Sequence, residues 1–140
     1  MSVSPDIQAT FDYLVGLAQK ALADNRSFAP FATTTLTGGE RTHSRTDLAP
    51  AVSTPGEHIS ALITALRRQA QSGGVRAAGL VFDAAAPSDV QGGADAICVH
   101  AETAEGEAVQ IFVAYTRGRS PVPVYAEPVI QDVPARIFAA

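Results

Sequence analysis

Cysteine is almost missing from this sequence of 140 residues, which contains Cys98 alone. A single cysteine excludes an internal disulfide and favours a reducing compartment. Because Cys98 lies among apolar neighbours, we expect its thiol to be buried and inert. Long hydrophobic runs are missing as well, and the first residues, MSVSPDIQ, have neither the basic start nor the apolar run of a signal peptide. We therefore expect a soluble cytoplasmic protein without a membrane partner.

Basic residues are fewer than acidic residues: the sequence has ten Lys and Arg residues, 14 Asp and Glu residues and a net charge of −4. This balance excludes a broad electrostatic footprint for nucleic acid. The sequence also has no Walker loop, no glycine fingerprint for a dinucleotide and no nucleophile elbow, so we expect no cofactor. The three histidines have no paired spacing, so we expect no metal site. They are His43, His58 and His100.

Apolar residues make up 46% of the sequence and charged residues only 17%, which favours a folded globule. A chain of this length is a natural single domain, so we expect one α+β domain over residues 1–140. Its last part, residues 121–140, is interrupted by Pro123, Pro128 and Pro134. Because proline cannot donate to a strand ladder, we expect this segment to be an extended edge strand or a strap over the surface.

The most informative stretch is Ala94–Thr116, which predicts two strands joined by a turn at Glu105-Gly106. A two-residue loop there pairs His100 with Ile111. Both strands carry mainly apolar residues on both faces, whereas a sheet with one solvated face should alternate between apolar and polar residues. The hairpin is therefore predicted to be covered on both sides.

Periodicity and end signals define the remaining elements. Apolar residues at helical spacing predict a helix from about Pro5 to Ala23. A capping box at Thr54-Pro55-Gly56-Glu57 begins a second helix, which ends at Ser72-Gly73-Gly74. Further strands are predicted at Phe28–Leu36, Arg41–Thr46 and Val75–Asp83. The order α-β-β-α-β-β-β-(β) indicates an α+β fold, in which two helices cover one face of a five- to six-stranded antiparallel sheet.

Helices on one face leave the other face of the sheet to be covered by something else. A second protomer, the proline-rich tail or a ligand can cover it. Two-fold self-association is the commonest of these solutions, so we predict a homodimer.

Several short motifs resemble a family of short bacterial proteins of unknown function. They are Phe28-Ala29-Pro30-Phe31, Gly38-Gly39-Glu40, Asp95-Ala96-Ile97, Glu102 and Tyr115. The resemblance spans most of the chain and implies a small α+β domain of cystatin-like type with no established activity. The order of helix, hairpin, helix and meander is also similar to that of profilin-like and roadblock domains, although a proline-rich tail stands where a roadblock domain has its final helix.

His100 and Glu102 are two residues apart on one predicted strand and therefore share a face, with Tyr115 on the neighbouring strand. A carboxylate beside an imidazole in a partly covered cavity can act as an acid–base pair. These three residues are the candidate catalytic set. The alternative is a polar strand end that reaches solvent beside the turn, where such a pair contributes about 0–1 kcal/mol.

Two groups of basic residues are the candidate ligand-binding positions. Arg41, His43 and Arg45 alternate along one predicted strand, where they either bind an anion or form a solvated edge. Arg117 and Arg119 lie two residues apart in a turn, where they either contact a phosphate or a carboxylate or stay solvated.

Two functions from different classes follow. The first is a non-enzymatic binding or assembly module that self-associates through the second sheet face. The second is a small pocket enzyme or small-ligand binder with a cavity lined by His100, Glu102 and Tyr115. The fold class alone does not distinguish these two functions. We favour the first, because the sequence contains few candidate catalytic residues.

Overall fold

The computed structural model describes residues 3–24, 28–45, 54–85, 95–116 and 122–139. Within these residues, two helices and seven strands follow one another in the order α-β-β-α-β-β-β-β-β. Their bounds are α1 Pro5–Asp24, β1 Phe31–Leu36, β2 Arg41–Arg45, α2 Pro55–Ser72, β3 Val75–Ala85, β4 Asp95–Thr103, β5 Ala108–Thr116, β6 Val124–Tyr125 and β7 Val129–Asp132.

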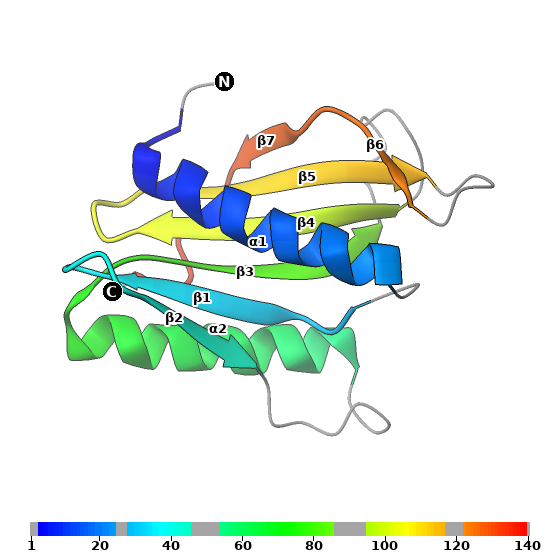
Figure 1. Ribbon diagram of the computed structural model, residues 1–140. Coiled ribbons are helices and arrows are strands. Elements are labelled where there is room, and N and C mark those ends of the chain that lie inside the picture. The colour runs from blue at the N-terminus through cyan, green and yellow to red at the C-terminus, as the bar shows by residue number, and fades with distance from the viewer. Residues whose placement is uncertain (1–2, 25–27, 46–53, 86–94, 117–121, 140) are drawn as a thin grey trace.

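All seven strands belong to one antiparallel sheet (Figure 1). The strand order is β2-β1-β3-β4-β5-β6, and β7 also pairs with β5. Because β1 lies between β2 and β3, the connection through α2 passes over β1. The predicted α+β class and antiparallel sheet are confirmed, and the sheet has seven strands where five or six were expected.

The β4–β5 hairpin differs in register by one residue from the prediction. His100 pairs with Gln110 rather than with Ile111, and the strands are joined by a three-residue loop, Ala104–Gly106. Gly106 has a φ of +104°, the left-handed conformation that such loops place on glycine. An acidic residue followed by glycine fits both loop lengths, and a shift of one residue moves every side chain of β5 to the opposite face.

The two helices lie on opposite faces of the sheet, so the prediction that both cover one face is wrong. Gly79 and Leu80 are neighbours in β3 and therefore face opposite sides. A side chain on Gly79 would meet Thr10 and Leu14 of α1, whereas Leu80 lies in the apolar cluster that α2 forms with the sheet. Figure 1 shows α1 crossing the front of the central strands. Because both faces of these strands are apolar, one helix on each face buries them better than two helices on one.

The C-terminal segment covers part of the α2 face. Ile137 is 1% exposed and belongs to the cluster formed by Leu66 and Leu80, with Phe138 packed against it. Residues 96–103 of β4 are all buried, which confirms that both faces of this strand are covered. A second protomer was expected because two helices on one face would leave the other face of the sheet open. The proline-rich tail, another of the covers considered, packs on the α2 face.

Both helices begin where the sequence indicates. Ser4 Oγ accepts the N–H of Ile7 at 3.3 Å, and Thr54 and Glu57 form the predicted capping box. Neither helix of the described chain has the length and hydropathy needed to cross a bilayer.

Candidate functional site

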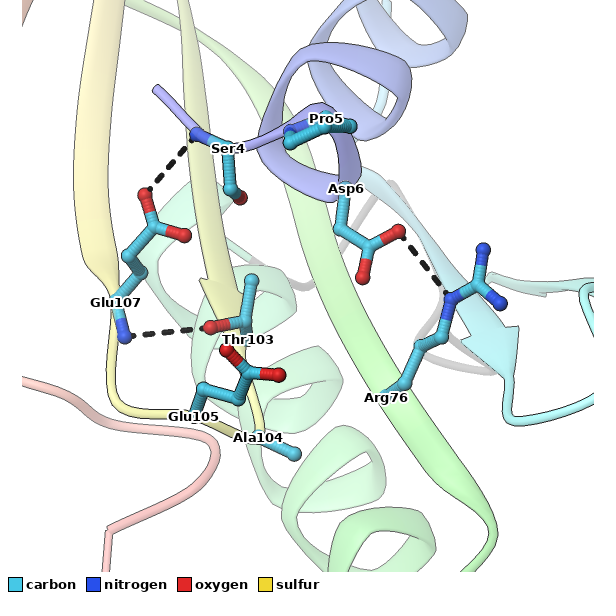
Figure 2. A pocket seen from close by; sticks show the side chains of 8 residues that line it. All are labelled: Ser4, Pro5, Asp6, Arg76, Thr103, Ala104, Glu105 and Glu107. Atoms are coloured by element: carbon cyan, nitrogen blue, oxygen red, sulfur yellow. Dashed lines mark hydrogen bonds and ion pairs between the residues drawn. The ribbon is translucent and has the colours of Figure 1, made fainter. Parts of the chain in front are cut away.

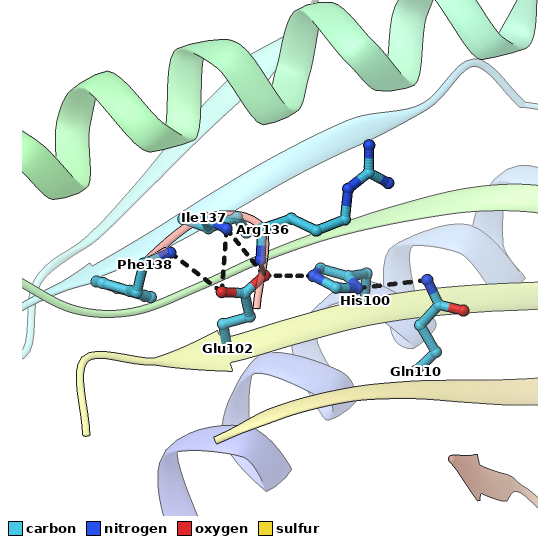
Figure 3. A network of polar contacts seen from close by, with 6 residues as sticks. All are labelled: His100, Glu102, Gln110, Arg136, Ile137 and Phe138. Atoms are coloured by element: carbon cyan, nitrogen blue, oxygen red, sulfur yellow. Dashed lines mark hydrogen bonds and ion pairs between the residues drawn. The ribbon is translucent and has the colours of Figure 1, made fainter. Parts of the chain in front are cut away.

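The candidate pair His100 and Glu102 lies inside the protein, on the α2 face of β4. His100 is 2% exposed and Glu102 is 0% exposed. His100 Nε2 lies 2.5 Å from Glu102 Oε2, and His100 Nδ1 lies 3.4 Å from Gln110 Nε2 (Figure 3). With the Gln110 amide as donor to Nδ1, the imidazole proton is on Nε2, where it donates to the carboxylate. The alternative of a polar strand end that reaches solvent is therefore wrong.

Glu102 binds the backbone of the C-terminal segment. The amide of Arg136 donates to Oε2 at 2.8 Å, the amide of Phe138 donates to Oε1 at 3.1 Å, and the amide of Ile137 lies 3.0 Å from both oxygens. Figure 3 shows these three amides converging on the carboxylate. A buried carboxylate is tolerated only when such donors surround it. We call this arrangement the C-terminal clamp: it fixes the segment that places Ile137 in the core.

The clamp determines how Glu102 titrates. Burial raises the pKa of Glu102, but the hydrogen bonds from His100 and from the three amides outweigh burial and hold its pKa below the usual range. The pKa of an unfolded Glu is about 4.3. Since the folded-state pKa is the lower one, the clamp contributes its full stability above the unfolded value and loses it as the pH falls through the folded value.

We therefore expect an acid-sensitive difference between the wild-type protein and Glu102→Gln, which has no ionisable group at this position. The difference in unfolding free energy should shrink as the pH falls below about 4. Urea denaturation followed by circular dichroism at several pH values measures it. Glu57, whose pKa is lowered by hydrogen bonds from Thr54, is present in both proteins and cancels. An equal difference at pH 7 and pH 3 would contradict the clamp.

Tyr115 does not join His100 and Glu102. It packs in the apolar cluster on the α1 face, and its hydroxyl donates to Asp83 Oδ1 at 2.8 Å. The predicted sharing of one face by Tyr115, His100 and Glu102 is wrong, because the one-residue change in register moves the Tyr115 side chain to the other side of the sheet. The three residues line no common cavity.

Arg41 and His43 meet at an aromatic ring that the sequence did not single out. The Tyr13 hydroxyl, from α1, lies 2.8 Å from His43 Nδ1. The guanidinium carbon of Arg41 lies 4.6 Å from the centre of the Tyr13 ring, where a cation is attracted to the ring face. Arg41 and His43 thus share one face of the sheet, as predicted, and this face is the one that α1 covers. We call Tyr13, Arg41 and His43 the edge cluster, because β2 is the outer strand of the sheet.

The edge cluster contains no acidic partner among the described residues. In that part of the chain the ion pairs are Arg76 with Asp6 and His100 with Glu102. Arg41 Nη1 is shielded from solvent and has no hydrogen-bond acceptor among the described residues. A shielded charged donor without an acceptor is unfavourable. Because Arg41 as a whole is only partly buried, an anionic group that binds its guanidinium would compensate this charge.

A cavity of about 370 Å³ lies between the start of α1 and the β4–β5 turn (Figure 2). Its polar groups bind one another: Glu107 accepts the N–H of Ser4 at 3.3 Å, and Arg76 Nε lies 3.2 Å from Asp6 Oδ1. These contacts fasten the helix to the hairpin. They leave no unpaired donor comparable to Arg41 Nη1, so we favour the edge cluster as the binding site.

The structure does not test the remaining basic candidates as site residues, whereas it describes the surroundings of Cys98. Arg45 ends β2, where it pairs with Phe31, and Arg117 and Arg119 lie outside the described residues. Cys98 is buried, as predicted, and burial raises the pKa of its thiol to about 12, so almost no thiolate exists at neutral pH. Among the described residues, no group of three His, Cys, Asp or Glu side chains is arranged to hold a metal ion.

These features define a class of protein: an α+β domain with one antiparallel sheet, a helix on each face and a basic and aromatic cluster at one sheet edge. Comparison with protein-family models, with curated proteins and with solved structures finds no match to this chain. The resemblance drawn from its short motifs stays a prediction.

Proposed function

We propose that this protein is a non-enzymatic binding module that recognises an anionic group at the edge cluster. The observation that carries the proposal is the Arg41 guanidinium, which lies over the Tyr13 ring and whose Nη1 has no acceptor in the described part of the chain. His43 beside it is exposed and lies within reach of the same ligand. A planar guanidinium binds carboxylates and phosphates through paired hydrogen bonds, and a ring beneath it fixes its orientation.

The role of the buried pair supports a function without catalysis. Glu102 accepts hydrogen bonds from three amides of its own chain, and His100 faces Glu102 and Gln110. An acid–base pair must come within hydrogen-bond distance of a substrate proton. With exposures of 2% and 0%, His100 and Glu102 do not reach solvent. Their contacts account for them as structural residues.

Succinate, a small dicarboxylate, tests the proposal by titration in two-dimensional ¹H–¹⁵N NMR spectra. We expect the amide resonances of Tyr13, Arg41 and His43 to shift. Arg41→Gln should weaken binding at least about tenfold, since a hydrogen bond to a charged group contributes about 1.5–3 kcal/mol.

Arg68→Gln is the matched control, because it removes the same charge from an exposed position on α2. It should leave succinate binding unchanged. Equal losses in Arg41→Gln and Arg68→Gln would reduce the effect to net charge and overturn the proposed site.

Self-association, a cytoplasmic location and a cystatin-like or profilin/roadblock-like identity stay predictions from the sequence. If the chain forms a homodimer, the part of the α2 face that carries Leu80 and Ile137 is a poor candidate for the interface, since α2 and the C-terminal segment cover that part.

A further inference from the structure

We propose that the anion recognised at the edge cluster belongs to an extended acidic segment of another protein, which adds to the sheet as a strand beside β2. This inference rests on the proposed function and names its partner. β2 is the last strand of the sheet, and among the described strands it pairs with β1 alone. No described residue pairs with the second side of β2, and an edge of this kind can accept a further strand, a recurring mode of peptide recognition.

The hydrogen-bond pattern identifies which backbone groups of β2 face outward. Leu36 donates its N–H to Glu40 O at 2.8 Å, so these two residues form a hydrogen-bonded pair. Hydrogen-bonded pairs recur at every second residue of an antiparallel ladder, which makes Thr34 and Thr42 the next such pair. The N–H and C=O groups of Thr42 thus point toward β1. Those of the alternate residues, Arg41, His43 and Arg45, point toward the free edge.

The residues whose backbone groups point toward the free edge are also the basic residues of β2. Their spacing specifies where the partner strand should carry acidic side chains. Residues directly opposite each other on neighbouring strands share a face of the sheet. A strand added to β2 therefore places every second side chain beside Arg41 and His43, on the α1 face. Acidic side chains at these alternate positions would pair with the two basic residues, while the backbone bonds to the outward N–H and C=O groups. We infer a segment with acidic residues at positions i and i+2.

A second copy of this chain does not fit the same edge. Antiparallel pairing of two β2 strands about His43 would bring Arg41 of one copy to the register position of Arg45 of the other, and like charges opposite each other are unfavourable. The chain has one pair of acidic residues two positions apart, Glu105 and Glu107. They flank Gly106 in the β4–β5 turn, where Glu107 also binds Ser4, so they are not available as a strand.

Two peptides of the same composition test the inference with the full chain. In the first, Glu and Thr alternate; in the second, the Glu residues form one block. Titration by calorimetry should give a dissociation constant at least about tenfold lower for the alternating peptide, the effect of about 1.4 kcal/mol. Hydrogen exchange should show new protection of the Arg41, His43 and Arg45 amides in its presence.

Two variants at one position separate backbone pairing from side-chain recognition. His43→Gln keeps the outward N–H, whereas His43→Pro removes it without removing a bond to β1. We expect His43→Gln to weaken alternating-peptide binding only in part, since one side-chain contact is lost, and His43→Pro to abolish it, with both variants folded by circular dichroism.

The other outcomes are decisive as well. Equal binding of both peptides without protection of the edge amides overturns strand addition and leaves the anion site intact, as succinate binding would show. No binding of either peptide or of succinate overturns the proposed function itself. A dimer in light scattering that the alternating peptide does not displace, with β2 amides already protected, assigns the edge to a second copy instead.

Discussion

Replacing Glu102 with Ala should lower the free energy of unfolding by about 3–5 kcal/mol, the range for removing one partner of a buried charged network. The loss has two sources. Three amides of the C-terminal segment and the ring of His100 lose their shared acceptor, and a fully buried side chain is replaced by a smaller one. Urea denaturation at neutral pH measures the change. Glu105→Ala, in the exposed β4–β5 turn, is the matched control and should stay within about 0.5 kcal/mol of the wild type.

Amide hydrogen exchange distinguishes loss of the clamp from general destabilisation. In Glu102→Ala, the amides of Arg136, Ile137 and Phe138 should lose their protection while those in the centre of β4 keep theirs. If the three amides exchange as slowly as in the wild type, the clamp does not hold the segment.

Gly79→Ala is the second substitution with a large expected effect. A Cβ atom at this position would lie 2.8 Å from His100 O and 2.8 Å from Thr10 Cγ2, with Leu14 Cδ1 at 3.2 Å. Because one of these atoms is backbone in the neighbouring strand, relief requires α1 or β4 to move. We expect a loss of about 2–3 kcal/mol in unfolding free energy, at the upper end for overpacking.

Gly16→Ala is the matched control for the Gly79 substitution. Gly16 lies on the exposed side of α1, and an added Cβ meets nothing within 4 Å. The same chemical change should therefore stabilise the protein by about 0.5–1 kcal/mol, since Ala has the higher helix propensity. Opposite signs for the two substitutions, measured by urea denaturation, are the expected result. A neutral Gly79→Ala would show that α1 does not approach β3 as closely as described.

The elements of this fold follow closely from local sequence signals. The Ser4-Pro5 start and the capping box at Thr54 set the beginnings of the helices, because caps depend on neighbouring residues only. The apolar character of Ala94–Thr116 correctly indicated a hairpin covered on both faces. The two helices and strands β1 to β5 were thus predictable to within a few residues, whereas β6 and β7 were expected only as an extended segment.

The arrangement of these elements was less predictable. The turn containing Gly106 is compatible with loops of two or three residues, and the choice between them assigns Tyr115 to one face or the other. The sides taken by α1 and α2 depend on how the connection over β1 passes the sheet, which no local pattern specifies.

The candidate site was predictable only where it depends on residues close in sequence. Alternation along β2 correctly placed Arg41 and His43 together, but their contact with Tyr13 joins residues 30 positions apart in the case of His43. The signal for Tyr13 is an aromatic side chain outside the apolar stripe of α1. The sequence analysis selected Glu102 as a candidate residue. It did not predict the partners of Glu102 at residues 136–138, because these lie in a segment that the sequence indicates only to be extended.

One NMR titration tests the location of the ligand-binding site most directly. In it, the wild-type chain is titrated with the peptide in which Glu and Thr alternate. We expect resonance shifts confined to Tyr13 and to residues 41–45, with the resonances of His100 and Glu102 unchanged. Shifts centred on His100 and Glu102, or no shifts at any peptide concentration, would contradict the assignment of binding to the sheet edge and of the buried pair to the fold.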